Sequence, residues 1–211
     1  RVLFGDRNRL VHSPESITHK LITRISYVQQ AIKRGGKLTT FDVACLASVG
    51  GRIFTISNFF EIDLASALLK KHPGKCTRCS QKVCICGKVS NKRRRSHLIE
   101  DLELSAQLIT LNNSFTLLTS TYRNNNVRCG GASFTVGRLL EEAGEACCAI
   151  DPDTPRVELE GELADVFAWW IATCDMLGIE NLQGFMWAYY SWCCSVCHHC
   201  PCDCTPSYHR R

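Results

Sequence analysis

The chain has 211 residues, of which 45% are apolar and 21% are charged, and its formal net charge is +5. This composition can supply a hydrophobic core for one domain or two small ones, which excludes an intrinsically disordered chain. No apolar run approaches the roughly 20 residues of a membrane-spanning helix, and the first residues show no signal-peptide pattern. We therefore expect a cytoplasmic protein with no membrane partner.

The first half carries helix signals. Ser13-Pro14 predicts a helix start and Gly35-Gly36 predicts its end. Thr39 or Thr40 can cap a second helix over residues 41–60. Strand-like alternation is scarce, so we expect a helical bundle.

A knot of four cysteines follows this predicted bundle, and a second knot with the same spacing lies near the C-terminus. Their residues are Cys76, Cys79, Cys84 and Cys86, and Cys194, Cys197, Cys202 and Cys204. Four thiolates are enough to bind zinc in tetrahedral geometry. We interpret each knot as a structural Zn²⁺ site in a reducing compartment; an iron–sulfur cluster, zinc shared between the knots, and disulfides are the alternatives.

A polar stretch separates the two halves of the chain. Between Gly87 and His97, Lys, Arg, Ser and Asn replace periodic apolar residues, which indicates a boundary. The short basic run over residues 92–95 lacks interleaved aromatic residues, so nucleic-acid binding is not our first interpretation. The predicted organisation is a unit at 1–87, a basic linker at 88–97 and a second unit at 98–211.

The second half also has helical periodicity. We expect helices over residues 102–118, from Leu139 onward, over 159–177 and over 182–192. The turn at residues 151–155 should end with Asp153 or Thr154 capping the next helix, and Pro155 suits its first turn. Both halves are therefore predicted to be all-α.

Two acidic pairs lie on the helices that flank this turn: Glu142 with Glu145, and Glu162 with Asp165. Each pair is spaced by three residues, so its carboxylates share one helix face. Two antiparallel helices can bring the four carboxylates together, where Mg²⁺, or Mn²⁺ in its place, would offset their repulsion. One such pair alone is usually a solvated face, but two pairs joined by a turn favour a metal site and phosphate chemistry.

The chain contains an internal repeat. Corresponding cysteines of the two knots are separated by 118 positions, and the same offset pairs residues 20–22 with 138–140. After a one-residue gap, Leu46-Ala47 pairs with Leu163-Ala164. We therefore expect two helical-bundle units that form a pseudo-dimer, each ending in a four-cysteine knot.

The four carboxylates do not repeat. Glu142 and Glu145 correspond to Arg24 and Tyr27, and Glu162 and Asp165 correspond to Cys45 and Ser48. The pseudo-dimer is therefore expected to hold one competent centre, in the second half.

The acidic motif resembles that of the MazG-like, all-α nucleoside triphosphate pyrophosphohydrolases, in which Glu-Glu-x-x-Glu is followed by Glu-x-x-Asp. The resemblance covers residues 123–179 well and the first half as a diverged copy. It implies hydrolysis of an NTP or dNTP to a monophosphate and pyrophosphate, with Mg²⁺ held by Glu142, Glu145, Glu162 and Asp165. A homodimer of pseudo-dimers is a further option.

The resemblance also implies roles for neighbouring residues. Glu141 would orient water, Trp169 would lie near the base, and Asp175 stands where the family often has Asn. Trp169 could instead be a core or interface residue. Arg138, ahead of the acidic helix, and Arg123-Asn124, in the loop before it, are our candidates for binding the triphosphate.

A rival interpretation belongs to a different class. The chain could be a non-catalytic, zinc-bearing interaction module that binds nucleic acid through residues 92–95 and 209–211, with a residual acidic cluster.

Overall fold

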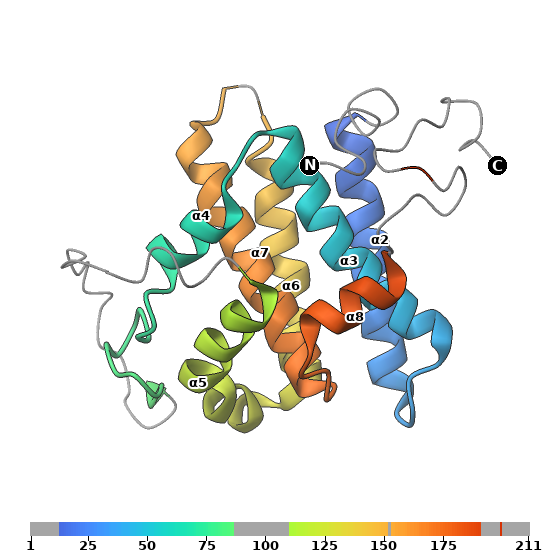
Figure 1. The fold of residues 1–211 in the computed structure, drawn as a ribbon, viewed down its shortest axis with the longest axis vertical. Helices are drawn as coiled ribbons and strands as arrows, with labels where there is room; N and C mark the ends of the chain where they lie inside the picture. Colours follow the sequence, from blue (N-terminus) through green and yellow to red (C-terminus); the bar gives the residue numbers. More distant parts are fainter. Residues whose placement is uncertain (1–12, 87–109, 152, 191–198, 200–211) are drawn as a thin grey trace.

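The computed structural model describes residues 13–86, 110–151, 153–190 and 199. They form seven α-helices and contain no strand, which confirms the all-α prediction (Figure 1). The helices are α2 (Pro14–Arg34), α3 (Thr40–Phe59), α4 (Leu64–Lys71), α5 (Leu111–Cys129), α6 (Gly131–Cys148), α7 (Arg156–Met176) and α8 (Leu182–Tyr189). The predicted linker at 88–97 and the second cysteine knot lie outside the described residues.

The local signals of the first half act as predicted. The Ser13 side chain accepts a hydrogen bond from the backbone of Ser16 and caps α2, and Gly35 ends this helix at φ 68°. At the start of α3, Thr39 and Asp42 form a capping box, in which each side chain accepts from the other residue's backbone amide at 3.2 and 2.9 Å. These caps satisfy amides that a helix start would otherwise leave unpaired.

Two boundary predictions in the second half were wrong. Residues 102–109 of the helix expected at 102–118 lie outside the described residues, but the described helix α5 continues past 118 to Cys129. Arg123 and Asn124 therefore lie inside α5 and not in a loop. The acidic helix α6 starts at Gly131, directly after the turn at Gly130, and Arg138 lies within it. The glycines end α5 because their positive φ angles interrupt the helix.

The cap of α7 also differs from the prediction. Pro155 occupies the N-cap position and no side chain caps this helix. The side chain of Asp151 instead accepts a hydrogen bond from the amide of Asp153 at 2.8 Å, and its carbonyl accepts from Thr154 at 3.0 Å. Asp151 therefore organises the turn before the helix, as short Asx side chains commonly do.

The helices pack with reciprocal contacts between the two halves. α6 and α7 run side by side through the centre of Figure 1, next to α2 and α3. α4 of the first half packs on α7, and α8 of the second half packs on α3. α4 and α8 are both eight residues long and start 118 positions apart, at 64 and 182, the offset that separates the cysteine knots.

One buried tryptophan joins the halves through the core. Trp170 of α7 is fully buried, and its indole N–H donates to the carbonyl of Leu46 in α3 at 2.9 Å. Its ring stacks on Phe167 and approaches Gly50 so closely that an added Cβ would lie 2.5 Å from the indole. The glycine lets α3 and α7 come together around this ring.

Within the described ranges, no single helix combines the length and the apolar character needed to cross a membrane. Among the helices that the structure describes, α3 and α4 taken together meet the criterion of length and composition, and they are bent by 103° relative to each other.

Candidate functional site

Three of the four predicted magnesium ligands converge. Candidate ligand oxygens of Glu142 and Glu145 on α6 and of Glu162 on α7 all lie within 4.8 Å of one another. The packing of α6 against α7 brings together the acidic faces that the sequence spacing had predicted. Glu162 Oε2 is buried and has no hydrogen-bond partner among the described residues. A buried carboxylate oxygen without a donor is a position that a hard cation can satisfy.

The clustering changes the acidity of these carboxyl groups. Burial, followed by the charge of Asp165, raises the pKa of Glu142 to about 7, although Arg138 acts in the opposite direction. Burial also raises the pKa of Glu162, with the charges of Asp165 and Glu145 adding to the effect. The donor set therefore consists of oxygens that repel one another, which fits a divalent cation.

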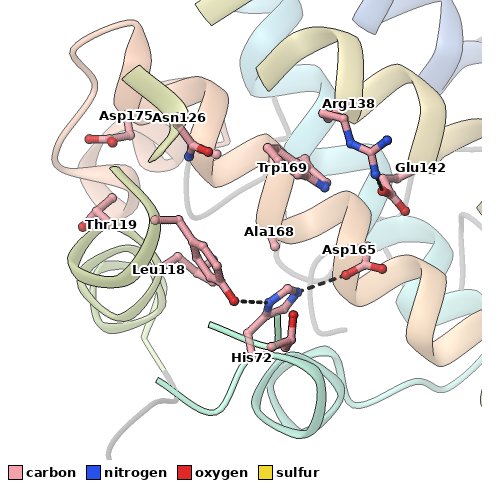
Figure 2. Close-up of a pocket in the computed structure, with 13 residues that line it drawn as sticks. His72, Leu118, Thr119, Asn126, Arg138, Glu142, Asp165, Ala168, Trp169 and Asp175 are labelled. Atoms are coloured by element: carbon pink, nitrogen blue, oxygen red, sulfur yellow. Dashed lines mark hydrogen bonds and ion pairs between the residues drawn. The ribbon is translucent and has the colours of Figure 1, made fainter. Parts of the chain in front are cut away.

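The fourth predicted ligand, Asp165, contacts residues from the first half of the chain. Its Oδ1 lies 3.0 Å from His72 Nε2 (Figure 2). Its Oδ2 forms an ion pair with Lys71. Lys71 also donates to the carbonyl of Gly161 at 3.0 Å. Burial would raise the pKa of Asp165, but the hydrogen bonds from His72 and Lys71 lower it below its usual value. Neither Lys71 nor His72 is among the site residues predicted from the sequence.

A pocket opens beside the carboxylate group. The cavity measures about 190 Å³ and is bordered by the end of α4, the first cysteine knot, α5, α6 and α7. Its lining residues are His72, Thr77, Leu118, Thr119, Tyr122, Asn126, Arg138, Glu142, Asp165, Ala168, Trp169, Ala172 and Asp175. Figure 2 shows Arg138, Glu142 and Trp169 close together in this pocket, with Asp175 and Asn126 at its opposite end.

Arg138 connects the carboxylates to an aromatic wall of the pocket. Its guanidinium forms ion pairs with Glu141 and Glu142, and its Cζ lies 5.5 Å from the ring centroid of Trp169. Trp169 is half-buried and makes an edge contact with Phe134. Glu141 itself is exposed and does not line the pocket.

Two further predicted binding residues pair with each other. The Arg123 guanidinium donates to both carboxylate oxygens of Asp175, from Nε at 2.9 and 3.1 Å. The Asp175 side chain is 1% exposed and lines the pocket, whereas Arg123 is 45% exposed and is not a lining residue. The pairing therefore places Arg123 behind the pocket wall.

The same helix explains why Asn124 is away from the pocket. Asn124 is exposed on α5, while Tyr122 and Asn126, four residues apart, share the face that lines the cavity. Tyr122 and Asn126 are not among the predicted site residues, because residues 123–124 were expected to lie in a loop. The spacing of Leu118, Tyr122 and Asn126 was the signal that could have identified them.

The first cysteine knot forms a second group of candidate metal ligands. The four sulfur atoms lie within 4.8 Å of one another, and those of Cys76 and Cys86 are 3.6 Å apart. Ligands 2.3 Å from a tetrahedral zinc ion would be separated by about 3.8 Å. All four cysteines are free thiols in the structure, so this cluster could hold a metal such as zinc.

The knot is attached to the wall of the pocket. The amide of Cys84 donates to the carbonyl of Thr121 in α5 at 2.7 Å, and Thr77 of the knot lines the cavity. Burial raises the pKa of Cys84 to about 11. For Cys79, backbone hydrogen bonds outweigh the effect of burial and lower the pKa to about 7. A zinc ion binds deprotonated thiols, and the backbone hydrogen bonds to Cys79 favour its thiolate form.

Comparison of the chain with protein-family models, with curated proteins and with solved structures finds no match.

Proposed function

We propose that the chain is a Mg²⁺-dependent nucleoside triphosphate pyrophosphohydrolase of the MazG-like type, with Mn²⁺ able to replace Mg²⁺. The observation that supports this proposal best is the convergence of Glu142, Glu145 and Glu162 beside a pocket that is lined by the Arg138 guanidinium and the half-buried ring of Trp169. The unpartnered Glu162 Oε2 adds a buried acceptor that a cation would satisfy.

The proposed reaction takes one water molecule. The water oxygen bonds to the α-phosphorus, the bond from this phosphorus to the oxygen bridging the α and β phosphates breaks, and the bridging oxygen leaves with pyrophosphate. The proton of the water is released, and the products are a nucleoside monophosphate and pyrophosphate. A bound Mg²⁺ would supply charge neutralisation and activation of water.

The chain's own residues would bind and orient the substrate. Arg138 is placed to donate to phosphate oxygens, because its guanidinium borders both the carboxylates and the pocket. Trp169, directly beneath that guanidinium, is placed to contact the base. Glu141 pairs with Arg138 outside the pocket lining, so we propose that it orients Arg138. Asp175 would accept hydrogen bonds at the far end of the pocket, supported by Arg123.

We also propose that the two halves form a pseudo-dimer with one catalytic centre. The supporting observations are the offset between α4 and α8, their reciprocal packing on α7 and α3, and the approach of Lys71 and His72 to Asp165. In this arrangement the first half contributes side chains to the site of the second half. The association of two such chains into a homodimer of pseudo-dimers is still a prediction from the sequence.

A substrate panel tests the activity. We expect pyrophosphate, and not orthophosphate, to be released from nucleoside triphosphates in the presence of Mg²⁺. Glu162→Gln should lower this rate at least a hundredfold, whereas Glu158→Gln, at an exposed position one turn earlier on α7, should leave it unchanged. Absence of release, or release that Glu142→Ala does not reduce, would favour the non-catalytic interaction module.

We propose that the first cysteine knot holds structural Zn²⁺. Metal analysis of protein purified without chelators should show one zinc ion fewer per chain in Cys79→Ser than in the unchanged protein. Cys129→Ser removes an exposed thiol outside the knot and should not alter the zinc content. Iron, or no metal under reducing conditions, would contradict the zinc assignment. The basic segments of the rival interpretation lie outside the described residues.

A further inference from the structure

The first half carries positive charge at the positions that form the carboxylate site in the second half. By the offsets of the repeat, Lys20 corresponds to Arg138, Arg24 to Glu142 and Arg52 to Trp169. The positions of Glu162 and Asp165 are taken by Cys45 and Ser48. Tyr27 corresponds to Glu145 and completes the set. These six positions of the first half therefore hold three basic residues and no carboxylate.

The packing of α2 on α3 gathers these side chains. Lys20 and Arg24 are one turn apart on α2, and Ser48 and Arg52 are one turn apart on α3, so each pair shares a helix face. Arg24 Nη1 donates to Cys45 Sγ at 3.6 Å, which brings the two faces into contact. Lys20, Arg24 and Arg52 are all partly buried.

Tyr190, at the end of α8, lies over this cluster from the second half. Its hydroxyl lies against Gly51 and forms a hydrogen bond with Ser48. Tyr190 corresponds in the repeat to His72, and Ser48 to Asp165, so this contact repeats the one between His72 and Asp165. Burial raises the pKa of Tyr190, whereas the charges of Arg52 and Arg24 oppose that rise. Both guanidinium groups therefore lie near the phenol.

Cations held close together in a partly buried site repel one another. Burial and the charge of Arg52 lower the pKa of Lys20. A bound anion would offset this repulsion, as a divalent cation would in the corresponding site of the second half. Guanidinium groups donate paired hydrogen bonds that match phosphate oxygens, and an ammonium group adds a further positive charge.

We propose that Lys20, Arg24 and Arg52 form a second binding site, independent of metal, for the phosphate groups of a polyphosphate or a nucleotide. The proposal rests on the tandem arrangement but not on hydrolysis in the second half. It gives the first half a ligand of its own in place of the lost magnesium site.

Calorimetric titration of tripolyphosphate into the full chain, in buffer without Mg²⁺, tests this site. Without the metal, the carboxylates of the second half repel polyphosphate, and binding that Arg24→Gln weakens reports on the first half. We expect saturable binding that weakens as the salt concentration rises. Arg24→Gln should weaken it about tenfold, because a hydrogen-bonded charge is lost. Lys33→Gln removes a charge from an exposed position on the same helix and should leave the affinity unchanged.

Three results would overturn the proposal. These are no binding by the unchanged chain, equal weakening by Lys33→Gln, and binding that a folded Arg24→Gln chain retains at full affinity, whether or not Arg138→Gln weakens it. Circular dichroism will establish whether Arg24→Gln is folded. If it is not, Lys20→Gln takes its place and the same tenfold weakening is expected.

A comparison of ligands identifies the source of the phosphates. Equal affinity for tripolyphosphate and a nucleoside triphosphate would show that the site recognises phosphates alone. Tighter binding of the nucleotide would show that the base or sugar contributes, and either outcome supports the site. Because no hydrolysis is measured, an inactive second half would not affect the result.

Discussion

The carboxylate cluster should cost the metal-free protein stability, and Glu142→Gln measures that cost. The Glu142 side chain is 7% exposed, and its pKa is raised from 4.5 to about 7. A group whose pKa is raised by folding stabilises the fold fully only below its unfolded pKa, and the contribution is lost as the pH rises through the folded value. The window for Glu142 is therefore about pH 4.5 to 7.

The size of the effect follows from the shift. At about 1.4 kcal/mol per pH unit, a rise from 4.5 to about 7 corresponds to roughly 3 kcal/mol above pH 7, an upper value that water near the cluster will reduce. Glutamine removes the charge but keeps an oxygen that can accept from Arg138. We expect Glu142→Gln to raise the free energy of unfolding by about 1–3 kcal/mol at pH 8 and to change it little at pH 4.5.

Urea denaturation followed by circular dichroism, in buffer without Mg²⁺, gives both values. Glu158→Gln, at an exposed position, should change the free energy of unfolding by less than about 0.5 kcal/mol at either pH. Mg²⁺ at a hundred times its dissociation constant should then stabilise the unchanged chain by about 2.7 kcal/mol and the Glu142 variant by less. A Glu142→Gln protein that is destabilised at pH 8 would refute the reasoning, because the cluster would then not be under electrostatic strain.

Two further changes test the core and the contact between the halves. Gly50→Ala should lower the free energy of unfolding by about 1–3 kcal/mol, because its Cβ would meet the buried indole of α7 at 2.5 Å. A Cβ added at Gly144 would meet no atom within 4 Å, so Gly144→Ala should leave the free energy of unfolding unchanged or raise it in the same urea titration. Lys71→Met should raise the pKa of Asp165, measured by NMR of the carboxyl carbon, because it removes one of the two partners that lower it. Lys70→Met, at the exposed neighbouring position, should leave that pKa unchanged, and equal shifts in both variants would contradict the assigned contact.

Short-range chemistry explains which helix ends were predictable. Ser13, Thr39 and Gly35 act through backbone groups within a few residues of themselves, so their roles can be read from the sequence. The prediction that Asp153 or Thr154 caps α7 was wrong, because the side chain of Asp151 organises the preceding turn and no side chain caps the helix. Alternative local hydrogen bonds of this kind compete closely, and sequence alone does not decide between them.

The sequence by itself determined the all-α class, the spacing that puts each acidic pair on one helix face, and the cysteine spacing that lets four sulfurs meet. These features follow from the period of the helix and from short loops. Tertiary structure alone decided that Asp165 faces Lys71 and His72, which are distant from it in the chain, and that Arg123 supports Asp175. Such contacts depend on how whole helices pack, because residues distant in sequence become neighbours only when the core between them is assembled.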